Sequence, residues 1–167
     1  ATGRAAGGRW GAWVQADADD RVQNGWHLGG LDWTDAASAL RIRTTGHVAR
    51  VRAYYVDSPI ETVSVRRLQV AGSPLIISRF SWQADESIRR VAPKYSDAVH
   101  YAVVHHTAGS NNYTRDESAA IVRGIEVYHV KGNGWNDIGY NFLVDKYGQV
   151  FDGRYGGVDK AVFGAHA

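Results

Sequence analysis

The chain contains 167 residues, of which 44% are hydrophobic. At roughly 100 to 200 residues per domain, this length accommodates one ordinary domain or two small ones with a buried core, which excludes disorder for most of the chain. Nineteen basic and 17 acidic residues leave a net charge of +2, too small to predict a nucleic-acid-binding surface. The absence of cysteine excludes thiolate metal ligands and leaves histidine and carboxylates. No apolar run approaches the ~20 residues of a membrane-spanning helix, so we expect no membrane insertion.

The first part of the chain is typical of short strands separated by turns. Apolar and arginine residues alternate with a period of two in its later segments, which buries one face of a strand and exposes the other. We expect strands at residues 10–15, 25–28, 39–44 and 51–56. Their spacing of roughly a dozen residues predicts a small antiparallel β-sandwich.

Proline-containing turns at Asp57-Ser58-Pro59 and Ala71-Gly72-Ser73-Pro74 flank one more apolar alternation, Val63 to Val70. They predict a boundary between a β-rich region at residues 1–70 and a second domain at residues 71–167. We expect the first nine residues, rich in glycine, alanine and arginine, to be poorly ordered.

Four arginines of the β-rich region could form a ligand-binding stripe, but arginine on the exposed face of a strand is more often solvated surface, and we favour that interpretation. These residues are Arg41, Arg43, Arg50 and Arg52.

The pattern changes after Val99. The apolar run Val99–Val104 has the length of a buried strand, and Thr114 with Glu117 forms a capping box before a helix expected at about 115–130. A hairpin of 138–144 and 149–152 follows, with a last short strand at 161–163. The fold class is therefore α+β overall, a β-sandwich followed by an α/β layer whose site lies at the end of its first strand.

His105 and His106 follow the predicted buried strand directly. Neighbouring side chains of a strand point to opposite faces, so at most one of the two is expected to bind a given metal ion. A hydrogen-bonded histidine at the rim of a core is the alternative, and the residues alone favour neither.

The run from Gly132 to Phe142 carries two further candidates. Trp135 lies between glycines on a polar loop, where an exposed indole is unfavourable unless it packs or binds, so we expect it to form a cleft wall. Tyr140 begins a buried type of strand, and its hydroxyl needs a partner, for which a backbone carbonyl is at least as probable as a ligand.

Five ordered motifs between residues 73 and 167 resemble those of the peptidoglycan recognition protein and type 2 N-acetylmuramoyl-L-alanine amidase family. They are Val103-Val104-His105-His106-Thr107-Ala108-Gly109, Tyr128-His129, Gly134-Trp135-Asn136-Asp137-Ile138-Gly139-Tyr140-Asn141-Phe142, Asp152-Gly153-Arg154 and Gly164-Ala165-His166-Ala167. The resemblance implies a mixed β-sheet flanked by helices, with a zinc ion at one end of a groove. The β-rich region resembles the accessory domain that precedes the amidase in secreted actinobacterial members.

By this resemblance, His105 is a zinc ligand and Tyr140 is catalytic, donating a hydrogen bond to the developing oxyanion. Substrate-binding residues lining the muropeptide groove are His106, His129, Trp135 and His166. Gly134-Trp135 together with Arg154 resembles the family members that accept stem peptides with meso-diaminopimelate. In such members a guanidinium can pair with the extra carboxylate of diaminopimelate.

The resemblance implies that the chain is a secreted bacterial protein that acts on the cell wall. The implied reaction is hydrolysis of the amide between N-acetylmuramic acid and L-Ala of the peptidoglycan stem peptide. The remaining zinc ligands of the family fall after the Ala-His-Ala motif, where this sequence stops, and a catalytic zinc normally needs three protein ligands. We therefore expect this chain to be the leading segment of an amidase. The remainder would be a second chain or would follow residue 167. The alternatives are a non-catalytic peptidoglycan-binding module and a protein-interaction or inhibitor module.

Overall fold

The computed structural model describes most of the second half of the chain and parts of the first. The described residues are 2–5, 8–13, 15, 18–23, 25–29, 37–56, 67–68, 72 and 74–164. Contacts divide the chain into two compact units, Ala1–Ala53 with Ala108–Tyr113, and Tyr54–Thr107 with Thr114–Ala167.

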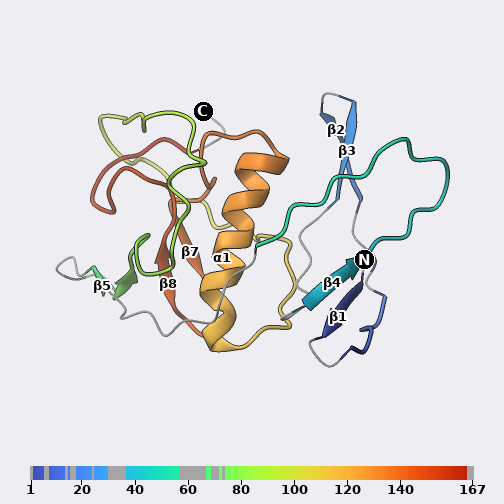
Figure 1. The fold of residues 1–167 in the computed structure, drawn as a ribbon. Helices are drawn as coiled ribbons and strands as arrows, with labels where there is room; N and C mark the ends of the chain where they lie inside the picture. Colours follow the sequence, from blue (N-terminus) through green and yellow to red (C-terminus); the bar gives the residue numbers. More distant parts are fainter. Residues whose placement is uncertain are drawn as a thin grey trace. The chain divides into compact units, whose positions relative to one another are not determined.

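The first unit contains two separate pairs of antiparallel strands (Figure 1). Strand β1 (Thr2–Ala5) pairs with β4 (Ala37–Arg41), and β2 (Ala18–Gln23) pairs with β3 (Trp26–Gly29). The predicted antiparallel pairing is therefore present, but the part of this unit that the structure describes contains two-stranded sheets and shows no sandwich.

Three expectations for this region differ from the structure. Thr2–Ala5 forms a strand where we expected disorder. Within 10–15, Trp10 makes an isolated bridge and the other described residues lie outside strands. Residues 51–56 form no strand, and Val51 to Tyr55 are exposed. An alternating pattern buries a face only when a neighbouring strand and a packed layer are available, and the described residues provide neither there.

A mixed four-stranded sheet organises the second unit. Its strands are β5 (Arg67–Leu68), β6 (Ile76–Ile77), β7 (Phe142–Val144) and β8 (Val150–Asp152), in the order β5-β6-β8-β7. β6 is parallel to β8, and the other pairs are antiparallel. Because β5 pairs with β6, the sheet begins before the predicted boundary at residue 70, and the contacts divide the chain earlier, at Ala53.

The predicted hairpin is confirmed as β7 and β8. The Asp145 carboxylate accepts hydrogen bonds from the backbone N–H groups of Tyr147 at 2.9 Å and Gln149 at 2.8 Å, and Gly148 has a φ of 74°. These contacts fix the tight turn, since aspartate satisfies nearby backbone donors and glycine adopts positive φ without strain.

The predicted helix is confirmed as three consecutive helical segments. A 3-10 turn, η1 (Arg115–Glu117), leads into α1 (Ser118–Val127), which continues as a π-turn, η2 (Tyr128–Gly132). The Glu117 carboxylate accepts a 2.6 Å bond from the backbone N–H of Thr114 at the start. Ser118, at the beginning of α1, donates to Asp145 at 2.6 Å, so the helix is tied to the β7–β8 turn.

The core of the second unit is centred on four fully buried apolar side chains, Trp82, Val130, Ile138 and Phe151. The Trp82 indole N–H donates to the Asp152 carbonyl at 2.7 Å, which satisfies its one polar group. Burial of each such side chain contributes roughly 1.5–3 kcal/mol. The loop between α1 and β7 is anchored to this core through Ile138.

The predicted buried strand at Val99–Val104 is wrong for this structure. Its residues lie outside strands, and Val104 is 100% exposed. A buried strand needs neighbours on both edges and both faces, and the described sheet ends at β7 without pairing to this segment. The predicted strand at 161–163 is reduced to one isolated bridge between Tyr95 and Val162.

Candidate functional site

His129 occupies the π-turn at the end of the helix and is 4% exposed. Its Nδ1 accepts a 3.0 Å hydrogen bond from the backbone N–H of Gly139, and its carbonyl accepts the backbone N–H of Trp135 at 2.9 Å. Since Nδ1 is an acceptor, the neutral ring carries its proton on Nε2. The loop and the helix end are thus held in one fixed arrangement.

Three rings meet at this point. The His129 ring centroid lies 4.5 Å from that of Trp135 and 5.3 Å from that of Tyr140, the latter edge to face. We call His129, Trp135 and Tyr140 the aromatic wall. Trp135 and Tyr140 are each partly exposed, so the wall is packed on one side and accessible on the other.

Gly139 is required for the close contact within the aromatic wall. A Cβ atom there would lie 2.6 Å from Cζ3 and 3.1 Å from Cε3 of Trp135. Carbon atoms cannot approach to 2.6 Å without a shift, so any side chain at this position would displace the indole. Glycine in this motif therefore fixes the position of Trp135.

The Tyr140 hydroxyl donates a 3.3 Å hydrogen bond to the carbonyl of His106. Its partner in the structure is thus a backbone carbonyl, the alternative that the sequence left open. Burial, with a smaller contribution from Tyr128, raises the pKa of the Tyr140 phenol above its usual value. The hydroxyl remains protonated at neutral pH and can donate to an oxygen of a ligand.

His105 and His106 form a second group, here called the histidine pair, next to Tyr140. Both are exposed, and their rings stack with centroids 4.9 Å apart and an interplanar angle of 7°. The expectation that they point to opposite faces is wrong, because the segment that carries them is not a strand. The His105 ring lies 6.1 Å from the Tyr140 ring, so the structure brings these two candidates together.

The described residues do not fit a catalytic zinc site by themselves. No group of three or more histidine, cysteine, aspartate or glutamate side chains is placed to hold a metal ion among them. A catalytic zinc uses three protein ligands and one open position. The histidine pair supplies at most two, and His166 lies outside the described residues.

Arg154 is placed differently from the other candidates, since it is only 9% exposed. Its backbone N–H donates to the Tyr140 carbonyl at 2.8 Å, and its guanidinium donates to the Ile138 carbonyl at 3.4 Å. Burial lowers the pKa of this guanidinium, and its Nε has no hydrogen-bond partner among the described residues. Arg154 therefore supports the backbone on which the aromatic wall is built.

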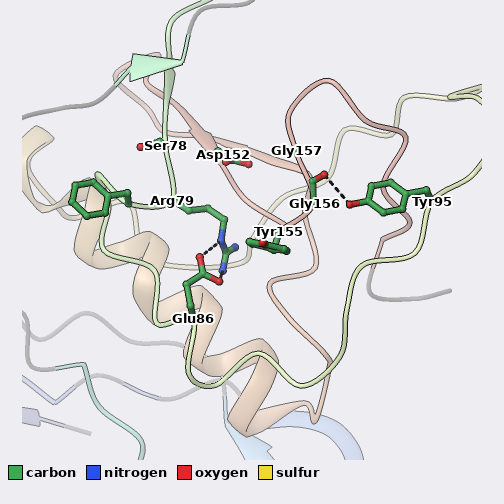
Figure 2. A pocket seen from close by; sticks show the side chains of 9 residues that line it. Ser78, Arg79, Glu86, Tyr95, Asp152, Tyr155, Gly156 and Gly157 are labelled. Atoms are coloured by element: carbon green, nitrogen blue, oxygen red, sulfur yellow. Dashed lines mark hydrogen bonds and ion pairs between the residues drawn. The ribbon is translucent and has the colours of Figure 1, made fainter.

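Sequence reasoning missed a group of charges, here called the charged cluster, in which Arg79, Glu126 and Asp137 are buried and Glu86 is exposed at its edge. The Arg79 guanidinium lies 2.7 Å from Glu86, 3.0 Å from Glu126 and 3.4 Å from Asp137. Arg79 and Glu86 both line a pocket of about 400 Å³. Figure 2 shows the two side chains facing each other there. A single glutamate within the apolar face of the helix was the signal that could have indicated it.

The charged cluster also holds the loop of the aromatic wall. The Asp137 carboxylate accepts the backbone N–H of Ile138 at 2.7 Å and that of Tyr155 at 2.8 Å. Asp152 lines the same pocket, and burial raises the pKa of its carboxyl to about 6 despite the nearby Arg79. The wall and the pocket are thus joined by one network of buried polar groups.

No helix in the described part of the chain is long and apolar enough to cross a membrane.

Comparison with known proteins gives related sequences but no matching family model. The chain is 38% identical over 79 residues to peptidoglycan-recognition protein SC1a/b of Drosophila simulans, covering 47% of this chain and 42% of that protein. It is 39% identical over 94 residues to peptidoglycan-recognition protein SC2 of Drosophila melanogaster, covering 55% and 47%. Peptidoglycan recognition protein 1 of Bos taurus is 39% identical over 79 residues, covering 47% and 40%.

Among solved structures, bumblebee PGRP-SA has 36% identity and a TM-score of 0.43, covering 49% of this chain and 48% of that chain. The named relatives are animal proteins, so the predicted bacterial source stays a prediction. The chain spans less than half the length of the curated relatives described above. Over that part, the resemblance predicted from the motifs is confirmed, and the chain is a relative of the peptidoglycan recognition proteins.

Proposed function

We propose that this chain binds muropeptides, the peptide-bearing fragments of peptidoglycan, at the aromatic wall and the neighbouring histidine pair. The observation that carries the proposal is the rigid packing of His129, Trp135 and Tyr140 around the Gly139–His129 hydrogen bond. The relatives described above are named for peptidoglycan recognition. Since peptidoglycan lies outside the cell membrane, we also propose an extracellular site of action.

A pre-formed wall favours binding because few side chains must be ordered when the ligand arrives. The indole of Trp135 offers an apolar face to the lactyl or sugar carbons of a muropeptide. The bond from Tyr140 to the His106 carbonyl is long at 3.3 Å, so a ligand carbonyl can replace that acceptor at little cost. The histidine pair is exposed and supplies further donors and acceptors beside it.

The test is calorimetric titration of the chain with a monomeric diaminopimelate-type muropeptide. We expect Trp135→Ala to weaken binding at least about tenfold, because it removes the central aromatic contact. Tyr140→Phe removes one neutral hydrogen bond and should weaken binding about three- to tenfold. Tyr147→Phe, on the exposed β7–β8 turn, is the matched control and should bind like the parent. Absence of saturable binding by the folded parent would overturn the proposal.

The preference for meso-diaminopimelate is a finer part of the same proposal. Gly134, Trp135 and Arg154 together support it, although Arg154 is largely buried in the structure. If its guanidinium pairs with the extra carboxylate, a lysine-type muropeptide should bind at least about tenfold more weakly, as expected for loss of a charge-assisted pair. Equal affinity for the two muropeptides would show that Arg154 does not bind the ligand, and the proposal for the aromatic wall would be unaffected.

A second candidate function is hydrolysis of the amide between N-acetylmuramic acid and L-Ala. The observation that favours it is the 6.1 Å separation of the His105 and Tyr140 rings, which lets both act on one bound carbonyl. Tyr140 would donate a hydrogen bond to the oxygen that becomes negative, a contribution of on the order of 10²–10³ in rate. His105 stays the candidate zinc ligand, but the described residues do not complete such a site.

Release of free stem peptide from a muropeptide, measured by mass spectrometry with and without added zinc, tests this second function. We expect Tyr140→Phe to lose most of any turnover, a much larger loss than its about three- to tenfold weaker muropeptide binding. Binding without release by the parent would favour a recognition module over an amidase. Turnover that is unchanged in Tyr140→Phe would show that the assigned role is wrong.

A further inference from the structure

Three arginines of the first unit are stacked on three tryptophans. The guanidinium carbon of Arg41 lies 3.9 Å from the ring centroid of Trp10, that of Arg43 lies 4.6 Å from Trp13, and that of Arg52 lies 4.7 Å from Trp26. We call these three arginines the stacked arginines. The solvated-surface interpretation of the arginine stripe does not predict this arrangement, because a solvated guanidinium needs no aromatic partner.

The segment that carries the stacked arginines is strongly basic and exposed. Residues 37–56 contain four arginines and no aspartate or glutamate, and every residue from Leu40 to Tyr55 is exposed. Among the described residues, none of the stacked arginines forms an ion pair with a carboxylate. Their charge is therefore not compensated within the described part of the protein.

Stacking orients a guanidinium without using its hydrogen-bonding groups. The indole face contacts the flat face of the guanidinium, so the five N–H donors around its edge stay directed outward. A planar edge of this kind binds oxyanions bidentately, and an arginine held in place loses less entropy when it does so. Three such groups on one acid-free segment provide several contacts for a ligand that carries repeated negative charges.

We propose that the stacked arginines bind an anionic polymer with phosphodiester groups in its backbone, as a second site separate from the aromatic wall. Charge complementarity favours a polyanion over an uncharged glycan. A nucleic acid is disfavoured, because its bases bind by stacking on aromatic faces and a guanidinium covers one face of each of these tryptophans. The small net charge of the whole chain, +2, also disfavours a general nucleic-acid surface.

The experiment titrates the full chain with poly(glycerol phosphate) and follows tryptophan fluorescence, to which the three indoles beneath the arginines contribute among the six tryptophans of the chain. Arg43→Gln should weaken binding about tenfold, because it removes one bidentate contact. Arg50→Gln removes the same charge from the same segment but no stacked group among the described residues, so it should weaken binding less than about twofold. Arg43→Lys keeps the charge and should behave like Arg43→Gln.

Three results would overturn the proposal. Equal losses in Arg43→Gln and Arg50→Gln would indicate unspecific attraction between charges. Tighter binding of a single-stranded oligonucleotide of equal charge would assign the surface to nucleic acids. If the polymer neither changes the fluorescence nor binds at low salt, the stacked arginines are not a binding site. Circular dichroism of each variant establishes that its fold is retained, and muropeptide titration of Arg43→Gln should be unchanged, which separates this site from the aromatic wall.

Discussion

The aromatic wall and the histidine pair, the two sides of the candidate site, are held in place by different contacts. His129 is buried, and Gly139 fixes its ring by a backbone hydrogen bond. His105 and His106 are exposed on a segment outside any strand, and their described contacts are with each other and Tyr140. The comparison teaches that the aromatic wall is anchored in the core at His129, whereas the histidine pair contacts it at Tyr140, so the two groups have different structural requirements.

The aromatic wall depends on the charged cluster, which the histidine pair does not contact in the described structure. Arg79 bridges the helix and the loop by pairing with Glu126 and Asp137, and Asp137 holds the backbone that leads into Gly139. Changes in the charged cluster should therefore affect the wall strongly, whereas changes at His105 should leave it intact. Variants can test this difference in decreasing order of expected effect.

Arg79→Met should produce the largest loss of stability. It leaves Glu126 and Asp137 buried without their cation, and breaking a buried ion pair in this way costs about 3–5 kcal/mol. Denaturant unfolding followed by tryptophan fluorescence measures the change in free energy. Arg115→Met, at an exposed position in η1, is the matched control and should change it by less than about 0.5 kcal/mol. A similar, small effect of both variants would contradict a bridging role for Arg79.

Asp152→Asn should remove a pH-dependent contribution to stability. Burial raises the pKa of this carboxyl from 3.8 to about 6, so the folded protein binds more protons than the unfolded chain between these values. The free energy of unfolding therefore falls as the pH rises from about 4 to about 6, by up to about 3 kcal/mol from this group. Denaturant unfolding measured across this pH range should show that the free energy of unfolding falls less steeply with pH in the variant than in the parent. The same pH dependence in both proteins would contradict the assigned burial of Asp152.

His129→Ala and His105→Ala compare the two sides directly. The first leaves the buried N–H of Gly139 without an acceptor and removes a packed ring, which should cost about 2–3 kcal/mol. The second removes an exposed ring and should cost less than about 0.5 kcal/mol. His129→Asn returns an acceptor near the position of Nδ1 and should recover part of the loss. Equal costs for the two alanine variants would show that the histidine pair is as firmly built as the wall.

Local signals in the sequence predicted the elements that depend on near neighbours. The Thr114–Glu117 pair with helical spacing predicted the helix, and Asp145 to Gly148 predicted the β7–β8 turn. The apolar run Val99–Val104 predicted a buried strand wrongly, because apolarity gives a strand only where partners lie beside it. Helical spacing could have indicated a buried charge at Glu126, but not its partners, since Arg79 meets Glu126 and Asp137 only after folding brings distant segments together.

The candidate site was partly predictable for the same reason. Trp135, Gly139 and Tyr140 lie within one short motif, and that motif singled out Trp135 and Tyr140 as candidates. The acceptor of the Tyr140 hydroxyl, the carbonyl of His106, lies on a different segment, and so no local pattern could select it. The burial of Arg154 likewise depends on the packing of β8 against the core, which sequence spacing does not determine.

The most direct test of muropeptide recognition is a titration followed by ¹H–¹⁵N nuclear magnetic resonance, with three assigned signals compared. The indole N–H of Trp135 and the backbone N–H of Gly139 should shift together and saturate as a diaminopimelate-type muropeptide is added. The indole N–H of Trp82, which is buried and bonded to the Asp152 carbonyl, should stay unchanged. If neither Trp135 nor Gly139 shifts at excess muropeptide, the aromatic wall is not the binding site.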